Sequence, residues 1–132
     1  MPKQAAIMSP PVEKTVQARD FWSNTGIRLM KGRHYDFLAI GRWFDWFIDC
    51  DADGYRSALT APLQGLRRAP AQNWFQLMGS IDRRNDLIFP IGTHLANYQA
   101  PADGELTCFA NDLIWMYWNN YGSISLWVIP LS

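Results

Sequence analysis

The fold class is decided near the C-terminus by the stretch Ser123-Ile124-Ser125-Leu126-Trp127-Val128-Ile129. Within it Ile124, Leu126 and Val128 recur at every second position, which is the period of a β-strand with one buried face. Other short apolar segments are separated by Gly, Asn, Asp and Pro, and no amphipathic helical stretch occurs. The sequence therefore predicts an all-β chain, a single antiparallel β-sandwich of about eight strands with Greek-key or jelly-roll order.

Working upstream, further strands are expected in the segments Gly26–Leu29, His34–Trp43, Trp74–Ile81, Leu87–Phe89 and Glu105–Ala110. Residues 44–72 are expected to be irregular, with at most a short helix around Arg56–Thr60. Loops of this length are uncommon in compact domains unless they bind something or are disordered. Residues 1–14 are predicted to form a flexible N-terminal tail, and residues 15–132 are predicted to form the sandwich domain.

Length, composition and charge exclude several classes of protein. A chain of 132 residues, 48% of them hydrophobic, suits one domain with a single core. The formal net charge is zero and the basic residues are scattered, which argues against nucleic-acid binding. No apolar run is long enough for a membrane span, and the N-terminal residues lack the continuous apolar stretch of a signal peptide. We therefore expect a protein that is cytoplasmic or exported without a cleaved signal peptide.

A polar loop, residues 109–122, directly precedes the C-terminal strand and carries the candidate chemistry. Its carboxylate and carboxamide side chains are those of Asn111, Asp112, Asn119 and Asn120. Hard cations such as Ca²⁺ prefer oxygen ligands of this kind, in numbers that a loop can supply. The same residue types are also common where a turn between strands is capped, so the residues alone leave both interpretations open.

The loop resembles the motif of LecA-type lectins, a family of small calcium-dependent, galactose-binding bacterial proteins built as β-sandwiches. That family carries Asn-Asp, six residues, Asn-Asn, one residue and Gly before an alternating C-terminal strand. Here Asn111-Asp112 and Asn119-Asn120-Tyr121-Gly122 have the same spacing. Weaker similarities, such as Ala100-Pro101 and Pro90-Ile91, extend the resemblance from about Val16 to the end of the chain. The resemblance implies a galactose-binding-like β-sandwich.

The resemblance also implies a calcium site and its ligands. It places the side chains of Asp112, Asn119 and Asn120 around one Ca²⁺ ion, together with the main-chain carbonyl of Met116. A further carbonyl, from the loop after the third strand, falls at about Asp45. Two hydroxyl groups of a sugar, galactose or a related one, would complete the coordination of the calcium.

Sugar contacts implied by the resemblance fall on Asp112, Leu113, Met116, Asn119, Trp115, Trp118 and Gln64. The two tryptophans stand where the family has small or compact residues, so they could either stack on a pyranose ring or fill the sugar pocket. Gln64 lies in a segment similar to the one that carries a sugar-recognising glutamine in the family. The family's sugar-recognising histidine has no counterpart in residues 46–72.

A second acidic segment lies in the long irregular region, where Asp49-Cys50-Asp51-Ala52-Asp53-Gly54 resembles the first half of an EF-hand loop. The twelfth position is Thr60 instead of the bidentate Glu of an EF-hand, and no amphipathic helices flank the segment. An EF-hand is therefore not expected. An acidic, solvated turn and a second calcium site both stay open on the sequence alone.

Catalytic and redox chemistry have little support. The sequence lacks the Gly-x-Ser-x-Gly motif, and its only glutamates, Glu13 and Glu105, do not adjoin the Asp112 loop. Cys50 and Cys108 show no metal-ligand or disulfide spacing, and Cys108 is expected to be a core residue. We expect a non-enzymatic, calcium-dependent carbohydrate-binding protein that could form a homo-oligomer. The alternative is an interaction protein that kept the sandwich, lost the sugar site and binds a protein partner.

Overall fold

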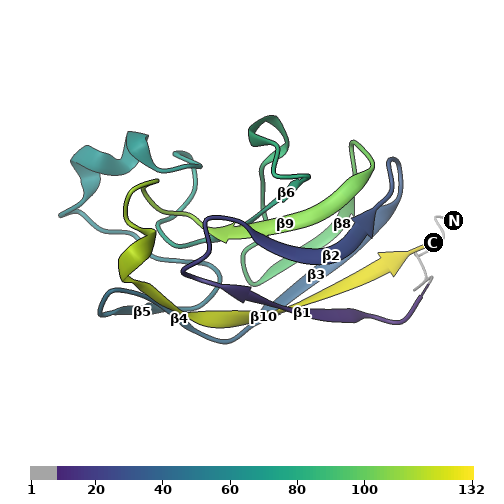
Figure 1. Ribbon diagram of the computed structural model, residues 1–132, viewed down its shortest axis with the longest axis horizontal. Helices are drawn as coiled ribbons and strands as arrows, with labels where there is room; N and C mark the ends of the chain where they lie inside the picture. The colour runs from purple at the N-terminus through teal and green to yellow at the C-terminus, as the bar shows by residue number, and fades with distance from the viewer. Residues whose placement is uncertain (1–8) are drawn as a thin grey trace, which may run out of the picture.

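The computed structural model describes residues 9–132, which form two antiparallel β-sheets packed face to face as a sandwich (Figure 1). The predicted all-β antiparallel sandwich is thereby confirmed. The first strand, β1 (Val12–Gln17), starts before residue 15, where the domain was expected to begin. Residues 1–8 of the expected tail lie outside the described residues.

The larger sheet has six strands in the order β5-β4-β10-β3-β8, with β1 also paired to β10. Besides β1 these strands are β3 (His34–Ile40), β4 (Trp43–Asp45), β5 (Ile48–Cys50), β8 (His94–Gln99) and β10 (Asn120–Leu131). The smaller sheet has the order β2-β9-β6-β7. Its strands are β2 (Ser23–Leu29), β6 (Leu77–Ile81), β7 (Phe89–Pro90) and β9 (Gly104–Ala110). Short 3-10 helices lie in the connections, namely η1 (Ala61–Leu66), η2 (Asn85–Leu87) and η3 (Tyr117–Asn119).

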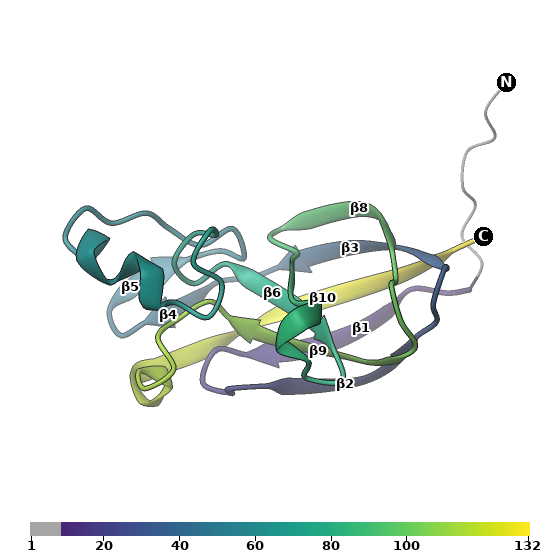
Figure 2. The ribbon, with the colours of Figure 1, turned by 90° about the horizontal axis from the view of Figure 1, so that it is seen from above.

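Strand β10 is the centre of the larger sheet and runs along the length of the molecule (Figure 2). It pairs with β4 at its start and with β1 and β3 further along. Ile124, Leu126 and Val128 are fully buried, as their alternation predicted. They belong to one core with side chains of both sheets, such as Phe37 and Leu106. Burial of this apolar surface is the main stabilising contribution to the sandwich.

The sequence did not predict β1, β5 and β8, and of β4 it predicted only the first residue, Trp43. The expected strand His34–Trp43 is divided into β3 and β4, because Gly41 has φ 121° and turns the chain between them. Strand β8 lies at a sheet edge and has no buried residue, so its sequence carries no apolar period. The helix expected around Arg56–Thr60 is instead η1, which begins one residue before Pro62, and proline favours a helix start.

The two cysteines are buried free thiols. Cys108 lies in β9 with no exposed surface, and burial raises the pKa of its thiol. It is therefore an unreactive core residue, as predicted. No helix within residues 9–132 is long and apolar enough to cross a membrane.

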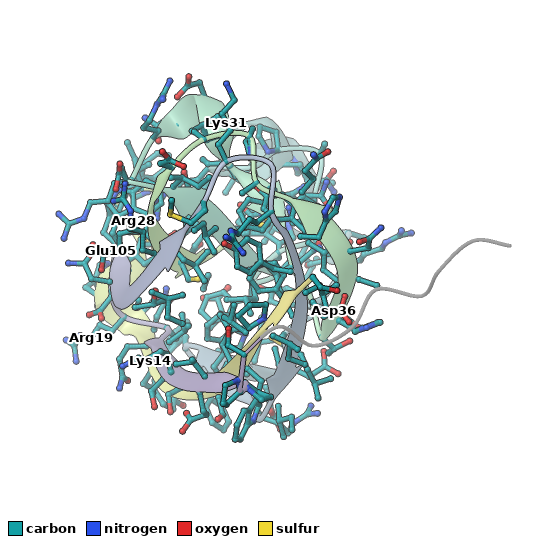
Figure 3. The ribbon with its side chains drawn as sticks, turned by 90° about the vertical axis from the view of Figure 1, so that its right-hand side faces the viewer. Lys14, Arg19, Arg28, Lys31, Asp36 and Glu105 are labelled. Atoms are coloured by element: carbon teal, nitrogen blue, oxygen red, sulfur yellow. The ribbon has the colours of Figure 1, made fainter. Side chains whose placement is uncertain are left out.

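The two ends of the sandwich differ in character. Strands β4 and β5 and helices η1 and η3 lie together at one end, on the left of Figure 1, and the C-terminus lies at the other. Figure 3 views the molecule from the C-terminal end and shows charged side chains that point outward, among them Lys14, Arg19, Arg28, Lys31, Asp36 and Glu105. The opposite end exposes the aromatic side chains of Trp46, Phe47, Trp115 and Trp118. A gathering of exposed aromatic side chains is typical of a binding surface.

Candidate functional site

A pocket of about 190 Å³ opens at the aromatic end of the sandwich. Its lining comes from the β4–β5 hairpin, the loop that contains η1, and the loop before β10: Asp45, Trp46, Phe47, Ile48, Tyr55, Thr60, Leu63, Trp74, Asp112, Leu113, Met116 and Asn119. Five residues that the sequence analysis assigned to metal or sugar contacts are among them, namely Asp45, Asp112, Leu113, Met116 and Asn119. The fold thus unites segments that lie far apart in the sequence.

Asp112 is 2% exposed, and the adjacent main chain holds its carboxylate. Its Oδ1 accepts a hydrogen bond from the Leu113 N–H at 2.7 Å, and its carbonyl accepts one from the Arg68 N–H at 3.1 Å. Its Oδ2 is buried and accepts no hydrogen bond of normal geometry within the described residues, although the nearby Asn120 amide acts to lower the pKa of this carboxyl. A buried carboxylate oxygen without a donor is unfavourable unless a group from outside the chain binds it.

Asn119 and Asn120 add two further buried oxygens. The Oδ1 atoms of both residues lack a partner in the part of the chain that the structure describes. The Nδ2 of Asn120 donates to the Ala18 carbonyl at 3.2 Å, which fixes the orientation of this amide. Asn120 is also the partner of Asp45 in the β4–β10 ladder. Three buried side-chain oxygens without donors therefore belong to residues that the sequence analysis proposed as metal ligands.

Asp45 brings a second carboxylate to the pocket, whereas the resemblance had pointed to its main chain. Its Oδ2 accepts a hydrogen bond from the Tyr55 hydroxyl at 2.5 Å. Burial raises the pKa of Asp45, and this hydrogen bond opposes the rise. Burial, followed by the nearby charge of Asp45, raises the pKa of Asp112 to about 6. None of the described residues that line the pocket is a lysine or arginine, so the two carboxylates have no compensating cation there.

Because the pKa of Asp112 is raised, the free energy of unfolding should fall as the pH rises when divalent cations are removed. The folded value of about 6 exceeds the ordinary value of 3.8, so the native state keeps a proton that the unfolded state releases. This stabilisation is fully present below the ordinary pKa and is lost as the pH rises through the folded pKa. In urea unfolding with chelator, the stability difference between wild type and Asp112→Asn should change by roughly 1 kcal/mol between pH 5 and pH 7. A pH-independent difference would show that the Asp112 pKa is not raised.

Exposed aromatic side chains lie beside the pocket without filling it. Trp115 is 54% exposed and Trp118 is 68% exposed, and neither lines the pocket. Trp46 and Phe47, which form the turn between β4 and β5, do line it, with ring centroids 4.8 Å apart. Trp46 has φ 58°, an uncommon conformation for a bulky residue and one that clusters at functional sites. Neither residue was predicted from the sequence, although two adjacent aromatic residues were an available signal.

Gln64 does not join the other predicted sugar contacts. It lines a neighbouring cavity of about 460 Å³, which shares Tyr55 and Trp74 with the first pocket. Thr60 and Leu63 are the residues of this loop that reach the Asp112 pocket. Because a 3-10 helix turns about 120° per residue, Gln64 projects in a different direction from Leu63.

The acidic segment that resembles half of an EF-hand forms a structural turn. Asp49 pairs with Arg42 at 2.7 Å, whereas Asp53 accepts hydrogen bonds from the N–H and the hydroxyl of Thr93. Asp51 accepts a hydrogen bond from the Asp53 N–H at 2.9 Å, which is an Asx-type turn. Throughout residues 9–132, no three His, Cys, Asp or Glu side chains converge as a metal site. Of the two interpretations that the sequence left open, these contacts favour the acidic turn.

Asn111, the first residue of the motif, is fully buried and acts as a structural clamp. Its Nδ2 donates to the carbonyls of Ala69 and Asn73, both at 2.9 Å. Its Oδ1 accepts a hydrogen bond from the Ala69 N–H at 2.9 Å. These bonds fasten the end of the long loop next to the Asp112 pocket. Of the two interpretations that the sequence left open for this loop, the structural one holds for Asn111.

Arg68 is a second structural residue that the sequence analysis did not single out. Its guanidinium carbon lies 3.6 Å from the Phe109 ring centroid and 3.8 Å from that of Phe21. The rings of Trp22 and Tyr117 complete an aromatic cage around it. One of its terminal nitrogens donates to the Phe21 carbonyl and to the Tyr117 hydroxyl. The cage holds the segment between η1 and β6 against the sandwich.

Comparison with solved structures identifies a similar fold in the N-terminal domain of EclA, a PllA-like lectin. The TM-score is 0.70 and the sequence identity 22%, over 96% of this chain and 97% of that one. The chain shares the fold of this domain. No protein-family model and no curated protein matches the sequence. The similarity agrees with the lectin-like part of the resemblance seen in the sequence, and at this identity it establishes the fold alone.

Proposed function

We propose that the protein binds carbohydrate in a calcium-dependent manner through the pocket around Asp112. One observation carries this proposal, the surplus of anionic and acceptor groups in the pocket. The carboxylates of Asp45 and Asp112 share it without a basic side chain among its described lining residues. Asp112, Asn119 and Asn120 each contribute a buried oxygen that has no donor in the described chain. A hard cation that prefers oxygen ligands would satisfy all of these groups together.

The side chains at the pocket are of the kinds that calcium prefers as ligands. Asp112, Asn119 and Asn120 would supply side-chain oxygens, Met116 its main-chain carbonyl, and Asp45 its carbonyl or its carboxylate. When bound, calcium offers coordination positions to two neighbouring hydroxyl groups of a sugar. Asp112 and Asn119, which both line the pocket, would accept hydrogen bonds from those hydroxyl groups and orient the ring.

Carbohydrate as the ligand class is supported by the fold and by the aromatic side chains at the pocket. The structural neighbour is a PllA-like lectin. Trp46 and Phe47 present apolar ring surfaces in the pocket that Asp112 also lines. A pyranose suits such a pocket, because it has both an apolar face and hydroxyl groups. The resemblance to LecA-type lectins makes galactose the first sugar to test.

A protein-interaction function is the second candidate, and the exposed aromatic side chains favour it. Trp46, Phe47, Trp115 and Trp118 are between 54% and 72% exposed. Aromatic residues are enriched at protein interfaces, including those of homo-oligomers. A protein-interaction function does not explain why buried oxygens of Asp112, Asn119 and Asn120 lack hydrogen-bond donors among the described residues, so we rank it second.

A melting experiment with and without calcium tests the proposal. A ligand that binds only the native state stabilises it by about 2.7 kcal/mol at 100 times its Kd, which shifts the melting temperature by on the order of 10 °C. Magnesium at the same concentration should give a smaller shift, because it demands near-octahedral geometry and dehydrates reluctantly. Galactose should add a further shift only when calcium is present. Equal melting temperatures in calcium and in chelator would contradict the proposal.

Trp118→Ala separates the two candidate functions. Because Trp118 is 68% exposed, its removal should change the free energy of unfolding by less than about 1 kcal/mol. If Trp118 stacks on a bound sugar, calorimetry should show a loss of about tenfold in saccharide affinity. Trp127→Ala, on the outer face of β10, is the matched control and should leave affinity unchanged. Unchanged saccharide affinity with loss of self-association in Trp118→Ala would favour the interaction protein.

A further inference from the structure

The cavity of about 460 Å³ next to the Asp112 pocket has the opposite electrostatic character. Its charged lining residues are Arg56 and Arg67, and no Asp or Glu lines it among the described residues. Gln64 and Asn73 add amide groups to its wall. The cavity therefore offers hydrogen-bond donors and positive charge, where the first pocket offers acceptors and negative charge.

Arg67 is the residue that most needs a partner in this cavity. It is 7% exposed and lies with its guanidinium 4.7 Å from the Trp74 ring centroid. One terminal nitrogen donates to the Pro70 carbonyl at 2.6 Å, but its buried Nε has no acceptor in the described chain. The ion pairs found within residues 9–132 do not include Arg67. A buried guanidinium without a carboxylate is costly unless an anion from outside compensates it.

Trp74 provides an independent second donor. It is 3% exposed, and its buried Nε1 also lacks an acceptor within residues 9–132. The indole N–H only donates, so this atom requires an oxygen or another acceptor to be satisfied. Two residues that line this cavity, and that are more than nine-tenths buried, thus each carry an N–H group without an acceptor among the described residues.

The two cavities are adjacent, because Tyr55 and Trp74 line both of them. A molecule held in the Asp112 pocket would therefore lie next to the second cavity on the side of Tyr55 and Trp74. Arg56 is exposed at the second cavity, and its Nε is 3.4 Å from the Asn73 Oδ1. That contact is long, so Arg56 has guanidinium N–H groups to offer to a ligand.

We propose that the second cavity binds an oxyanion, a carboxylate or a sulfate ester, carried by the saccharide that occupies the Asp112 pocket. This inference rests on the proposed function and narrows its substrate class to acidic sugars, either uronic acids or sulfated sugars. Guanidinium groups match such oxyanions in geometry and charge. Gln64, which sequence resemblance assigned to sugar recognition, would contact this acidic substituent.

Calorimetry at fixed calcium concentration tests the inference with galactose, galacturonic acid and galactose 6-sulfate. Galacturonic acid has the same arrangement of ring hydroxyl groups as galactose. Comparing it with galactose 6-sulfate shows whether a carboxylate or a sulfate ester is preferred. At least one acidic sugar should bind about tenfold more tightly than galactose, and added salt should reduce the preference. Arg56→Gln should remove the preference while galactose affinity stays unchanged, and Gln64→Glu should weaken binding of the acidic sugar. Both positions are exposed, so neither substitution should unfold the protein.

Arg28→Gln is the matched control, because it removes one exposed positive charge at the C-terminal end (Figure 3). It should leave the preference for the acidic sugar intact. Arg67→Gln should reproduce the effect of Arg56→Gln, provided that its circular dichroism spectrum matches wild type.

The outcomes separate this inference from the proposed function. Calcium-dependent binding of galactose with equal or weaker binding of both acidic sugars would overturn the inference and leave the proposed function standing. A preference for the acidic sugar that persists in Arg56→Gln and Gln64→Glu would also overturn it. If no sugar binds, inorganic sulfate should still raise the melting temperature of wild type more than that of Arg56→Gln. No effect of sulfate in that case overturns the inference together with the proposed function.

Discussion

Asp112→Asn should abolish calcium binding and, with it, every calcium-dependent interaction with a saccharide. The substitution keeps the shape of the side chain but removes the negative charge of the one buried carboxylate whose Oδ2 has no partner in the described chain. Calorimetry should show saturable calcium binding to wild type and binding at least about 100-fold weaker in the variant. The fold should persist, because apolar burial and not this carboxylate stabilises the sandwich.

The matched control for this experiment is Asp86→Asn. Asp86 is an exposed carboxylate paired with Arg84 at 2.6 Å, so the change has the same chemistry at a site without orphaned oxygens. It should leave calcium affinity unchanged. If Asp112→Asn binds calcium as tightly as this control, Asp112 is not a calcium ligand.

Arg68→Ala should be the most destabilising single change in the long loop, reducing the free energy of unfolding by about 3 kcal/mol. The alanine leaves a cavity among Phe21, Phe109 and Tyr117 and removes the cation that these rings surround. It also removes the hydrogen bonds to the Phe21 carbonyl and the Tyr117 hydroxyl. Urea unfolding in chelator measures the change without a contribution from bound calcium.

Arg19→Ala provides the baseline for this measurement. Arg19 is exposed and points outward (Figure 3), so its removal should change stability by no more than about 0.5 kcal/mol. A loss below about 1 kcal/mol in Arg68→Ala would mean that the aromatic cage does not anchor the loop.

The fold class was predictable from sequence because the central strand buries alternate side chains. Ile124, Leu126 and Val128 have no exposed surface, so the alternation of apolar residues in the sequence directly indicates the strand. Strand β8 has no buried residue and β4 contains only three residues, so neither produces a readable period. The division of the expected strand at Gly41 follows from its positive φ, which the sequence does not specify.

The candidate site was predictable only on the side that is local in sequence. Asp112, Met116 and Asn119 lie within one loop, and their spacing alone indicated a shared role. The opposite wall, which includes Trp46 and Tyr55, is placed there by pairing of β4 with β10 and by the fastened loop. Two adjacent aromatic residues could mark Trp46 as a candidate, but that it faces Asp112 depends on tertiary packing, which the sequence does not specify.

For Gln64 and Asp45, the motif match predicted the position in the chain but not the full role of the side chain. The match located the segment that contains Gln64 but did not predict where its side chain points. That side chain lines the second cavity. For Asp45 it indicated a main-chain role, whereas the structure brings a carboxylate to the pocket as well. In both cases the side-chain environment, and not the position in the chain, determines the chemistry that is available.

A glycan array probed with the full chain, once in calcium and once in chelator, is the most direct test of calcium-dependent carbohydrate binding. Asp112→Asn and Asp86→Asn are probed in parallel as the inactive variant and its control. We predict binding to glycans, galactosides or their acidic derivatives among them, that is lost in chelator and in Asp112→Asn but kept in Asp86→Asn. Absence of glycan binding in both conditions, or binding that persists in chelator and in Asp112→Asn, would contradict the account.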